Sequence, residues 1–166
     1  MGRFSPRSAA SALRAFSNLA AIAAVVLLLS PRDGRAAAQT GNLGLGIVAG
    51  DPSGISGKLW TGPNNAIDFI VGFSLYHDYV SINADYVWHE WNVIPVQSGR
   101  LPLYYGMGLW TSISQGPAVG GRGIVGLEYL FPSAPLDVFL ELGPGIQILP
   151  DTGPAFSAGL GMRYFF

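Results

Sequence analysis

The feature of the sequence that most constrains its fold is a two-residue alternation of side-chain type that recurs through the chain after residue 40. Segment 66–76 is the clearest case, and its large apolar residues are Ile67, Phe69, Val71, Phe73 and Leu75. The positions between them include Asp68, Gly72 and Ser74. Because the side chains of a β-strand point alternately to opposite faces, a period of two is typical of strands with two different faces. The sequence therefore predicts an all-β fold.

We predict eight strands, separated by short segments rich in Gly, Pro, Asn, Asp and Ser. The strands are 43–49, 55–60, 66–76, 80–89, 101–114, 122–131, 136–148 and 155–166. The residues between them favour turns, and no predicted turn segment is longer than about nine residues; the one between the fourth and fifth strands is 94–99. Short connections between successive strands favour an up-and-down arrangement, so we expect a closed antiparallel barrel of eight strands.

The charged residues of the predicted strands all share one face, which is also the face that carries most of the Gly and Ser. They are Lys58, Asp68, Asp85, Arg122, Glu128, Asp137, Glu141 and Arg163. A soluble barrel of the lipocalin type would show the reverse pattern, with charges outside and large apolar side chains inside. A charge that faces lipid costs about 2 to 4 kcal/mol at the middle of a bilayer. The segregation therefore predicts a transmembrane barrel whose charges point into the lumen.

We expect inward side chains to fill this lumen, because an eight-stranded barrel is only just wide enough to hold them. The predicted polar network consists of Lys58, Asp68, Asp85, Glu128, Asp137, Glu141 and Arg163. Counting from the strand ends places Lys58 level with Asp68, and Arg163 level with Glu141. Ions out of water are stable only when paired, so our hypothesis is a structural network of salt bridges rather than an open pore.

Aromatic residues occur near many of the predicted strand ends. They are Trp60, Tyr76, Tyr79, Trp88, Trp91, Tyr129, Phe131 and Tyr164. Membrane barrels carry girdles of aromatic residues at the two bilayer interfaces, and we interpret this set as such girdles. The alternative interpretation is that these residues are ordinary parts of a core.

Residues 1–38 have the pattern of a cleavable secretory signal peptide. Three arginines within the first 14 residues precede an apolar run over 19–29, and the segment ends in three alanines up to Ala38. The apolar run is too short to cross a bilayer, which takes about 20 residues, whereas a basic start, a short apolar run and a small-residue end are typical of secretory signals. We therefore predict export, with the barrel over residues 39–166.

Charge argues against nucleic acid as a partner. The chain has nine Lys and Arg and ten Asp and Glu; five of the bases and one of the acids precede residue 39, which leaves four basic and nine acidic residues in the barrel. A domain with this acidic balance has no basic patch to contact phosphates. The absence of cysteine also excludes thiol chemistry and cysteine-ligated metal.

The two histidines do not form a recognisable catalytic or metal site. His77 falls in a predicted turn and His89 at the opposite end of the following strand. Neither has a serine and a carboxylate in an evident triad arrangement, and two histidines so far apart make a poor metal site. We read His77 as a solvated loop residue and His89 as a polar interfacial or lumen residue, and we predict no catalytic site, cofactor or metal.

The final predicted strand has apolar or aromatic residues at every second position, namely Leu160, Met162, Tyr164 and Phe166. With this segment, and with segments 50–54 and 84–89, the chain from about Asn42 onward resembles the OmpA/OmpX-type family of small outer-membrane β-barrels and uncharacterised outer-membrane barrels of bacteria. The resemblance implies that the alternate residues form a C-terminal signal for the outer-membrane insertion machinery. It implies the outer-membrane bilayer and that machinery as partners, and no particular activity.

If both chain termini face the periplasm, the connections on the outer side are short for this family, which argues against an adhesin or receptor. They are 50–54, 76–79, 114–121 and 150–154. We therefore expect an integral outer-membrane barrel with a structural or interaction role and no enzymatic activity. A small-solute channel is the first alternative, and a lipid-modifying outer-membrane enzyme is the second.

Overall fold

The computed structural model describes residues 41–73, 80–113 and 117–166. The predicted signal peptide, 1–38, lies outside these residues, as do His77 and the predicted girdle residues Tyr76 and Tyr79. None of the described residues belongs to a helix long and apolar enough to cross a membrane.

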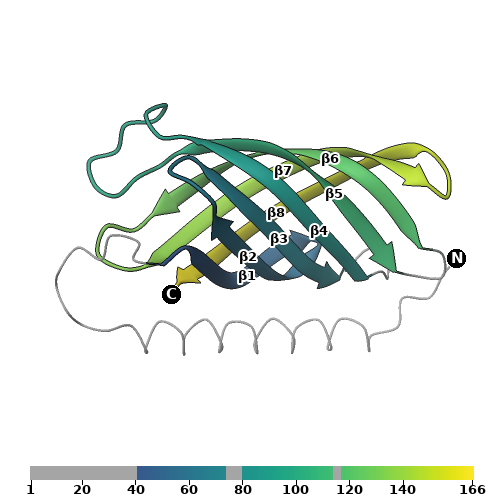
Figure 1. The fold of residues 1–166 in the computed structure, drawn as a ribbon, viewed down its shortest axis with the longest axis horizontal. Helices are drawn as coiled ribbons and strands as arrows, with labels where there is room; N and C mark the ends of the chain where they lie inside the picture. Colours follow the sequence, from purple (N-terminus) through teal and green to yellow (C-terminus); the bar gives the residue numbers. More distant parts are fainter. Residues whose placement is uncertain (1–40, 74–79, 114–116) are drawn as a thin grey trace, which may run out of the picture. The chain divides into compact units, whose positions relative to one another are not determined.

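Eight antiparallel strands form a closed barrel and follow one another around it in chain order (Figure 1). The strands are β1 (Leu43–Asp51), β2 (Ser53–Trp60), β3 (Asn65–Phe73), β4 (Val80–Glu90), β5 (Leu103–Ile113), β6 (Ala118–Leu130), β7 (Leu136–Leu149) and β8 (Gly153–Phe165). Each strand pairs with its neighbours in sequence, and β8 pairs with β1 to close the sheet, with Gly44 opposite Phe165. The predicted all-β, eight-stranded closed barrel is confirmed.

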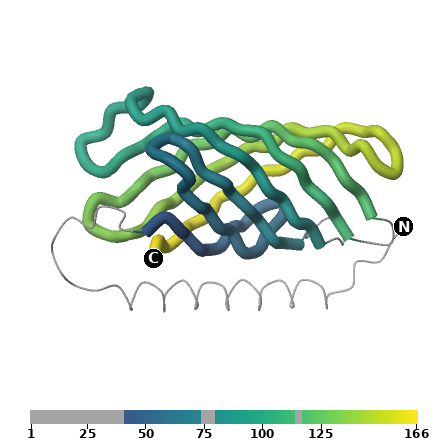
Figure 2. Tube along the Cα trace, in the orientation of Figure 1, coloured from purple at the N-terminus to yellow at the C-terminus, as the bar shows by residue number. Residues whose placement is uncertain are grey.

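The barrel has two distinct ends. The start of β1, the end of β8 and the connections 61–64, 91–102 and 131–135 lie together at one end, which we call the terminal end (Figures 1 and 2). Pro52, between β1 and β2, and residues 150–152, between β7 and β8, lie at the other end, which we call the distal end.

The connection between β4 and β5 is longer than predicted, because it comprises all of residues 91–102. Pro95 and Pro102 have no N–H group to donate to a strand ladder, which explains why β5 begins only at Leu103. The segment is held by contacts with β6 instead. The Tyr129 hydroxyl donates to the Ser98 carbonyl at 3.1 Å, and Arg100 forms an isolated bridge with Leu130.

The predicted start of the sixth strand is wrong, because the predicted turn 115–121 extends too far along the chain. β6 already begins at Ala118, so Gly120 and Gly121 belong to the strand. Gly120 lies opposite Trp110, and a Cβ atom at this position would be only 2.5 Å from the indole ring. The glycine therefore makes room for a large neighbour rather than a turn. The other strand ends lie within one or two residues of their predicted positions, apart from the end of the third predicted strand, 74–76, which lies outside the described residues.

Exposure alternates along the strands in the predicted sense. The inward apolar residues form a buried cluster of Val48, Ala66, Ile70, Val87, Tyr104, Ile124 and Phe139. Large apolar residues on the other face are exposed, as in Met107 at 65% and Leu109 at 64%. All eight inward charged residues are buried, with at most 6% of their surface exposed. The other charged residues of the described chain lie at strand ends or in connections, and are Asp51, Glu90, Arg100 and Asp151.

Candidate functional site: the charged lumen

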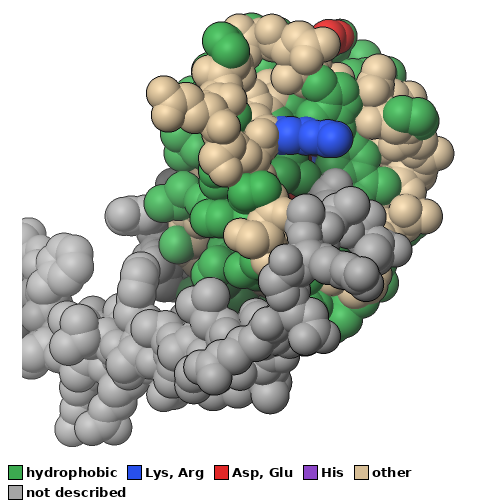
Figure 3. Space-filling view, turned by 90° about the vertical axis from the view of Figure 1, so that its left-hand side faces the viewer, with side chains coloured by type: hydrophobic (Ala, Val, Ile, Leu, Met, Phe, Trp, Pro, Cys, Tyr) green, Lys and Arg blue, Asp and Glu red, His purple; other side chains and the backbone are tan. Residues whose placement is uncertain are grey.

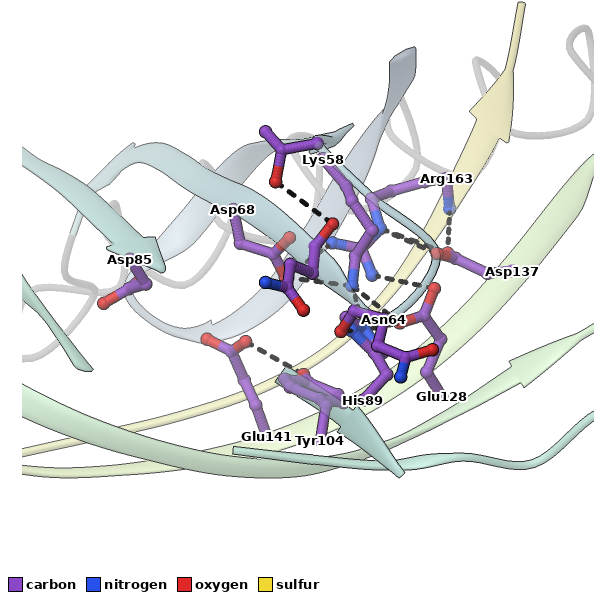
Figure 4. Close-up of polar contacts among 12 residues, drawn as sticks. Lys58, Asn64, Asp68, Asp85, His89, Tyr104, Glu128, Asp137, Glu141 and Arg163 are labelled. Atoms are coloured by element: carbon purple, nitrogen blue, oxygen red, sulfur yellow. Dashed lines mark hydrogen bonds and ion pairs between the residues drawn. The ribbon is translucent and has the colours of Figure 1, made fainter. Parts of the chain in front are cut away.

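Lys58 is the centre of a buried ion cluster near the terminal end of the lumen (Figure 4). The β2–β3 register places it directly opposite Asp68, and its Nζ lies 3.3 Å from Asp68 Oδ2. The same ammonium group donates a hydrogen bond of 2.6 Å to Glu128 Oε2, which reaches into the lumen from β6. The prediction that Lys58 and Asp68 lie at the same depth in the barrel is therefore confirmed.

Arg163 on β8 joins the same cluster from another side (Figure 4). It lies opposite Asp137 of β7, and both its Nε and its backbone N–H donate to that carboxylate, at 2.9 Å and 3.1 Å. Its Nη1 donates to Asp68 at 3.2 Å, and its Nη2 lies 3.6 Å from Glu128. Two cations thus share two of the three carboxylates.

His89, at the end of β4, completes this terminal-end cluster. Its Nε2 lies 3.0 Å from Glu128 Oε2 and 2.8 Å from Lys58 Nζ, and its Nδ1 lies 3.3 Å from the Asn64 carbonyl (Figure 4). The sequence predicts an interfacial or a lumen position for His89, and the structure places it in the lumen. Its inward position on β4, two residues after Val87, was the available signal.

A second ion cluster lies deeper in the lumen and is organised by Arg122 of β6. Its Nε donates to Asp85 Oδ1 at 2.9 Å, and its Nη2 donates to the other oxygen of the same carboxylate. Its Nη1 donates to Ser157 Oγ at 2.9 Å, and its Nη2 lies 3.6 Å from Glu141 Oε1. The Tyr104 hydroxyl donates to Glu141 Oε2 at 3.1 Å, which fixes that carboxylate from the other side.

The predicted level of Arg163 and Glu141 is wrong. The β7–β8 register places Glu141 opposite Gly159 and places Asp137 opposite Arg163. Four residues of strand separate the two positions, or about 13 Å along the strand. Glu141 consequently pairs with Arg122, which belongs to the second cluster.

The network as a whole carries an excess of negative charge. Three cations, Lys58, Arg122 and Arg163, face five buried carboxylates, Asp68, Asp85, Glu128, Asp137 and Glu141. The formal sum is minus two with His89 neutral.

Large side chains fit into this narrow lumen because glycines lie beside them. A Cβ atom at Gly126 would lie 2.4 Å from the Tyr104 ring, and one at Gly161 would lie 2.4 Å from the Phe139 ring. The Arg163 guanidinium in turn lies 4.1 Å from the centre of the Phe139 ring. The lumen at the terminal end is thus occupied by side chains, in agreement with the width of an eight-stranded barrel.

Rings at the terminal end separate into two groups. Trp91 stacks with Trp60 and with His89, and the Trp60 ring lies against His89 at a tilt of 45°; the three centroid distances are 4.4 to 5.9 Å, so the two indole rings cover the ion cluster. Interpreting Trp60 as a girdle residue is therefore wrong, because the ring packs against the lumen cluster. The second group makes ring contacts on the outer face: Tyr86 with Trp88, Trp88 with Tyr105, Tyr129 with Phe131, and Tyr164 with Phe166.

The face of the terminal end is mainly hydrophobic and uncharged polar, with basic side-chain atoms near its middle (Figure 3). Arg100 is the exposed basic residue of the connection 91–102, and its guanidinium lies 5.5 Å from the centre of the Trp91 ring. The Trp91 indole N–H donates to Asn64 Oδ1 at 3.0 Å. This hydrogen bond ties the long β4–β5 connection to the connection between β2 and β3.

The four residues of the predicted C-terminal signal alternate with inward residues along the end of β8. Leu160 is 55% exposed and Phe166 is 67% exposed, while Met162 and Tyr164 are partly exposed on the same side. The backbone N–H of Phe166 donates to the Leu43 carbonyl at 3.0 Å, so this end is tied to β1.

The chemistry that the lumen supports is mutual neutralisation of charge, since every inward cation contacts a carboxylate. Among the described residues, no group of three His, Asp or Glu is placed to hold a metal ion. The hydrogen-bonding neighbours of His89 are Lys58, Glu128 and Asn64.

The sequence matches no protein-family model, and searches of curated proteins and of solved structures found no significant match. The resemblance to OmpA/OmpX-type barrels therefore stays a prediction.

Proposed function

We propose that the protein is an integral outer-membrane β-barrel with a structural or interaction role, exported with the help of its N-terminal signal peptide. The observation that carries this proposal is the distribution of side chains between the two faces of the barrel. Large apolar residues are exposed on the outer face of every strand, and the eight charged residues of the strands other than Asp51 and Glu90, which are the last residues of β1 and β4, are all buried in the lumen.

This distribution suits a hydrocarbon solvent better than water. Monomeric proteins in water rarely expose contiguous apolar patches larger than a few hundred Å², whereas exposed Ile, Leu, Val, Met and Phe side chains recur around this barrel. A closed barrel also pairs the backbone groups of its strands, as the bilayer interior demands.

The dimensions of the strands support the same proposal. A transmembrane β-strand needs about 9 to 11 residues when it is tilted by about 45°, and these strands have 8 to 14 residues. The outer-face ring contacts at the terminal end, such as those of Trp88 and Tyr129, fit an interfacial girdle.

The filled lumen supports a structural or interaction role over a small-solute channel. Lys58, Arg163 and their carboxylate partners occupy the terminal half with direct ion pairs. An ion that passed through would have to displace these groups from partners that are already buried. In this proposal the partners of the chain are the outer-membrane bilayer and, during assembly, the insertion machinery that reads Leu160, Met162, Tyr164 and Phe166.

The proposal is tested by expressing the full chain in a Gram-negative host and following its location and its fold. We expect the protein in the outer-membrane fraction, with mass spectrometry showing an N-terminus near residue 39. The detergent-extracted protein should migrate differently on a gel before and after boiling, as a closed barrel does. Recovery of a folded, strand-rich protein in the periplasm without detergent would overturn the proposal.

A further inference from the structure

A cavity of about 60 Å³ lies in the lumen toward the distal end, beyond the second ion cluster. Its polar lining residues are Ser81, Asn83, Trp110, Arg122 and Ser157, and the rest of its lining is glycine or apolar. One water molecule needs about 10 to 15 Å³ of such space, so the cavity has room for a ligand of about four to six heavy atoms.

Asn83 of β4 presents a side-chain amide to this cavity. The residue is inward, two positions before Asp85, and only 3% exposed. Its amide forms no hydrogen bond with any described residue. Ser81 Oγ and Trp110 Nε1 also lack partners, but these two atoms are fully buried and closed to the cavity, whereas the Asn83 amide is open to it. Because buried polar groups are normally hydrogen-bonded, the open amide points to an occupant of the cavity.

The other polar groups that reach the cavity are largely engaged. Arg122 donates to both oxygens of Asp85 and, from Nη1, to Ser157 Oγ. Ser157 Oγ in turn donates to the Gly143 carbonyl at 3.3 Å. A Cβ atom at Gly143 would lie 3.4 Å from Arg122 Nη1, so the glycine leaves space beside this nitrogen. The open capacity therefore consists of the Asn83 carbonyl and NH₂ groups, the second hydrogen of Arg122 Nη1 and one lone pair of Ser157 Oγ.

The charges around the cavity favour an uncharged ligand. The adjoining ion cluster holds one cation, Arg122, and two carboxylates, Asp85 and Glu141, so its formal charge is minus one. An anion would compete with these carboxylates for Arg122. A cation would meet the Arg122 guanidinium, which lines the cavity where the carboxylates do not. The Asn83 amide offers one acceptor beside one donor, and another amide offers the complementary pair.

We propose that this cavity is a binding site for one small primary amide or urea. The ligand carbonyl accepts a hydrogen bond from Asn83 Nδ2, and the ligand NH₂ group donates to Asn83 Oδ1, so that two hydrogen bonds close a ring. A half-turn of the Asn83 amide only exchanges the two bonds. Arg122 Nη1 is a further donor for the ligand carbonyl. The site belongs to the lumen, so the inference holds for the barrel in a bilayer or in water and does not rest on the proposed location.

The test is a titration of the ¹⁵N-labelled, folded barrel in detergent with acetamide and with urea, followed by NMR. The reporters are the side-chain NH₂ group of Asn83, identified by its loss in Asn83→Ala, and the backbone N–H of Ser157, which also lines the cavity. Acetate and guanidinium are the matched controls, because they have the shapes of acetamide and urea but carry a charge. The side-chain NH₂ group of Asn65 is the internal control, since it donates to the Tyr86 hydroxyl at 2.8 Å and does not line the cavity.

We expect saturable shifts of the Asn83 NH₂ group with acetamide and with urea, and no change at Asn65. Asn83→Ala should weaken the affinity read at Ser157 about tenfold or more, because two hydrogen bonds are lost. The variant should still fold, since the Asn83 amide has no partner among the described residues. Asn65→Ala removes an amide outside the cavity and should leave the affinity unchanged.

Four results would each overturn the proposal: an Asn83 shift that rises linearly without saturation, an equal shift at Asn65, binding of acetate or guanidinium as tight as that of the uncharged ligands, or an unchanged affinity in Asn83→Ala. The absence of any shift would also overturn it, and would show that the cavity holds only water.

Discussion

At the scale of single residues, the stability of the lumen depends on matching each buried charge with a partner and each large ring with a glycine. Arg163 is 1% exposed and contacts three carboxylates. Tyr104 lies against Gly126 and is also bound to Glu141. Both arrangements can be tested by single substitutions with close controls.

Replacing Arg163 with Leu should destabilise the barrel by about 3 to 5 kcal/mol, because it leaves buried carboxylates without their cation. The measurement is the free energy of unfolding of the refolded barrel in detergent, from a denaturant titration followed by tryptophan fluorescence. Arg100→Leu is the control, since Arg100 is exposed and loses only a contact with Trp91, worth less than about 1 kcal/mol. Wild-type stability in Arg163→Leu would contradict the network hypothesis.

Gly126→Ala should destabilise the barrel by about 1 to 3 kcal/mol, because the new methyl group would overlap the Tyr104 ring and force it away from Glu141. Gly121→Ala is the matched control on the same strand. Its Cβ would point outward, with its nearest neighbour 3.9 Å away. The same denaturant titration compares the two, and equal stabilities would show that the Tyr104 ring and the Leu140 carbonyl, which would lie 2.6 Å from the new Cβ, both shift at little cost.

The position of each residue on one face of its strand could be predicted from the sequence, but its partner across the lumen could not. Period-two alternation placed all eight charged residues inside, and counting along adjacent strands placed Lys58 beside Asp68. The contact between Arg163 and Asp68 joins β8 to β3 across the barrel. Such contacts depend on the stagger of the strands around the closed sheet, which the sequence of one strand does not contain. Glu141 and Arg163 lie on neighbouring strands, and the register that pairs Asp137 with Arg163 places them at different depths.

At the scale of the strand, the side chains on the outer face determine whether the barrel is stable in water or in lipid. Met107 lies near the middle of β5 and is 65% exposed. Met107→Lys should reduce the stability of the membrane-inserted barrel by about 2 to 4 kcal/mol and lower its yield in the outer membrane. The measurement is refolding efficiency into lipid vesicles.

Val96→Lys is the control for this substitution, since Val96 is exposed at 39% but lies in the connection 91–102 rather than in a strand. It should refold as the wild type does. A soluble barrel would accept both lysines equally, so equal yields would argue against a lipid-facing outer wall.

The strands also show where sequence patterns mislead. Gly120 and Gly121 predict a turn by composition, yet they lie in β6 because Trp110 on the neighbouring strand occupies the space of a side chain at 120. Conversely, Val93, Ile94 and Val96 are apolar residues in a connection. Local propensity cannot distinguish these cases, because the decisive neighbour belongs to another strand.

At the scale of the whole molecule, the lumen is divided into a filled terminal half and a distal half that contains a cavity. The refolded protein should therefore give no stepwise conductance in a planar bilayer at high salt, because the ion pairs close one half of the path. Insertion is verified in parallel by the heat-dependent gel shift. Reproducible conductance steps from inserted protein would show that the network opens and would favour the channel alternative.

The seam between β1 and β8 has a consequence for the timing of assembly. Gly44 must meet Phe165, and Asp51 must meet Ala158, before the sheet loses its two free edges. Unpaired edges invite pairing with other chains, and contacts between residues so far apart form slowly. A partly synthesised chain cannot close the barrel, because β8, the strand that pairs with β1, follows the seven others in the sequence. Between synthesis and closure, the chain must be kept from pairing with its own copies. We therefore expect chaperone binding, rather than the intrinsic folding rate, to set the yield of folded barrel.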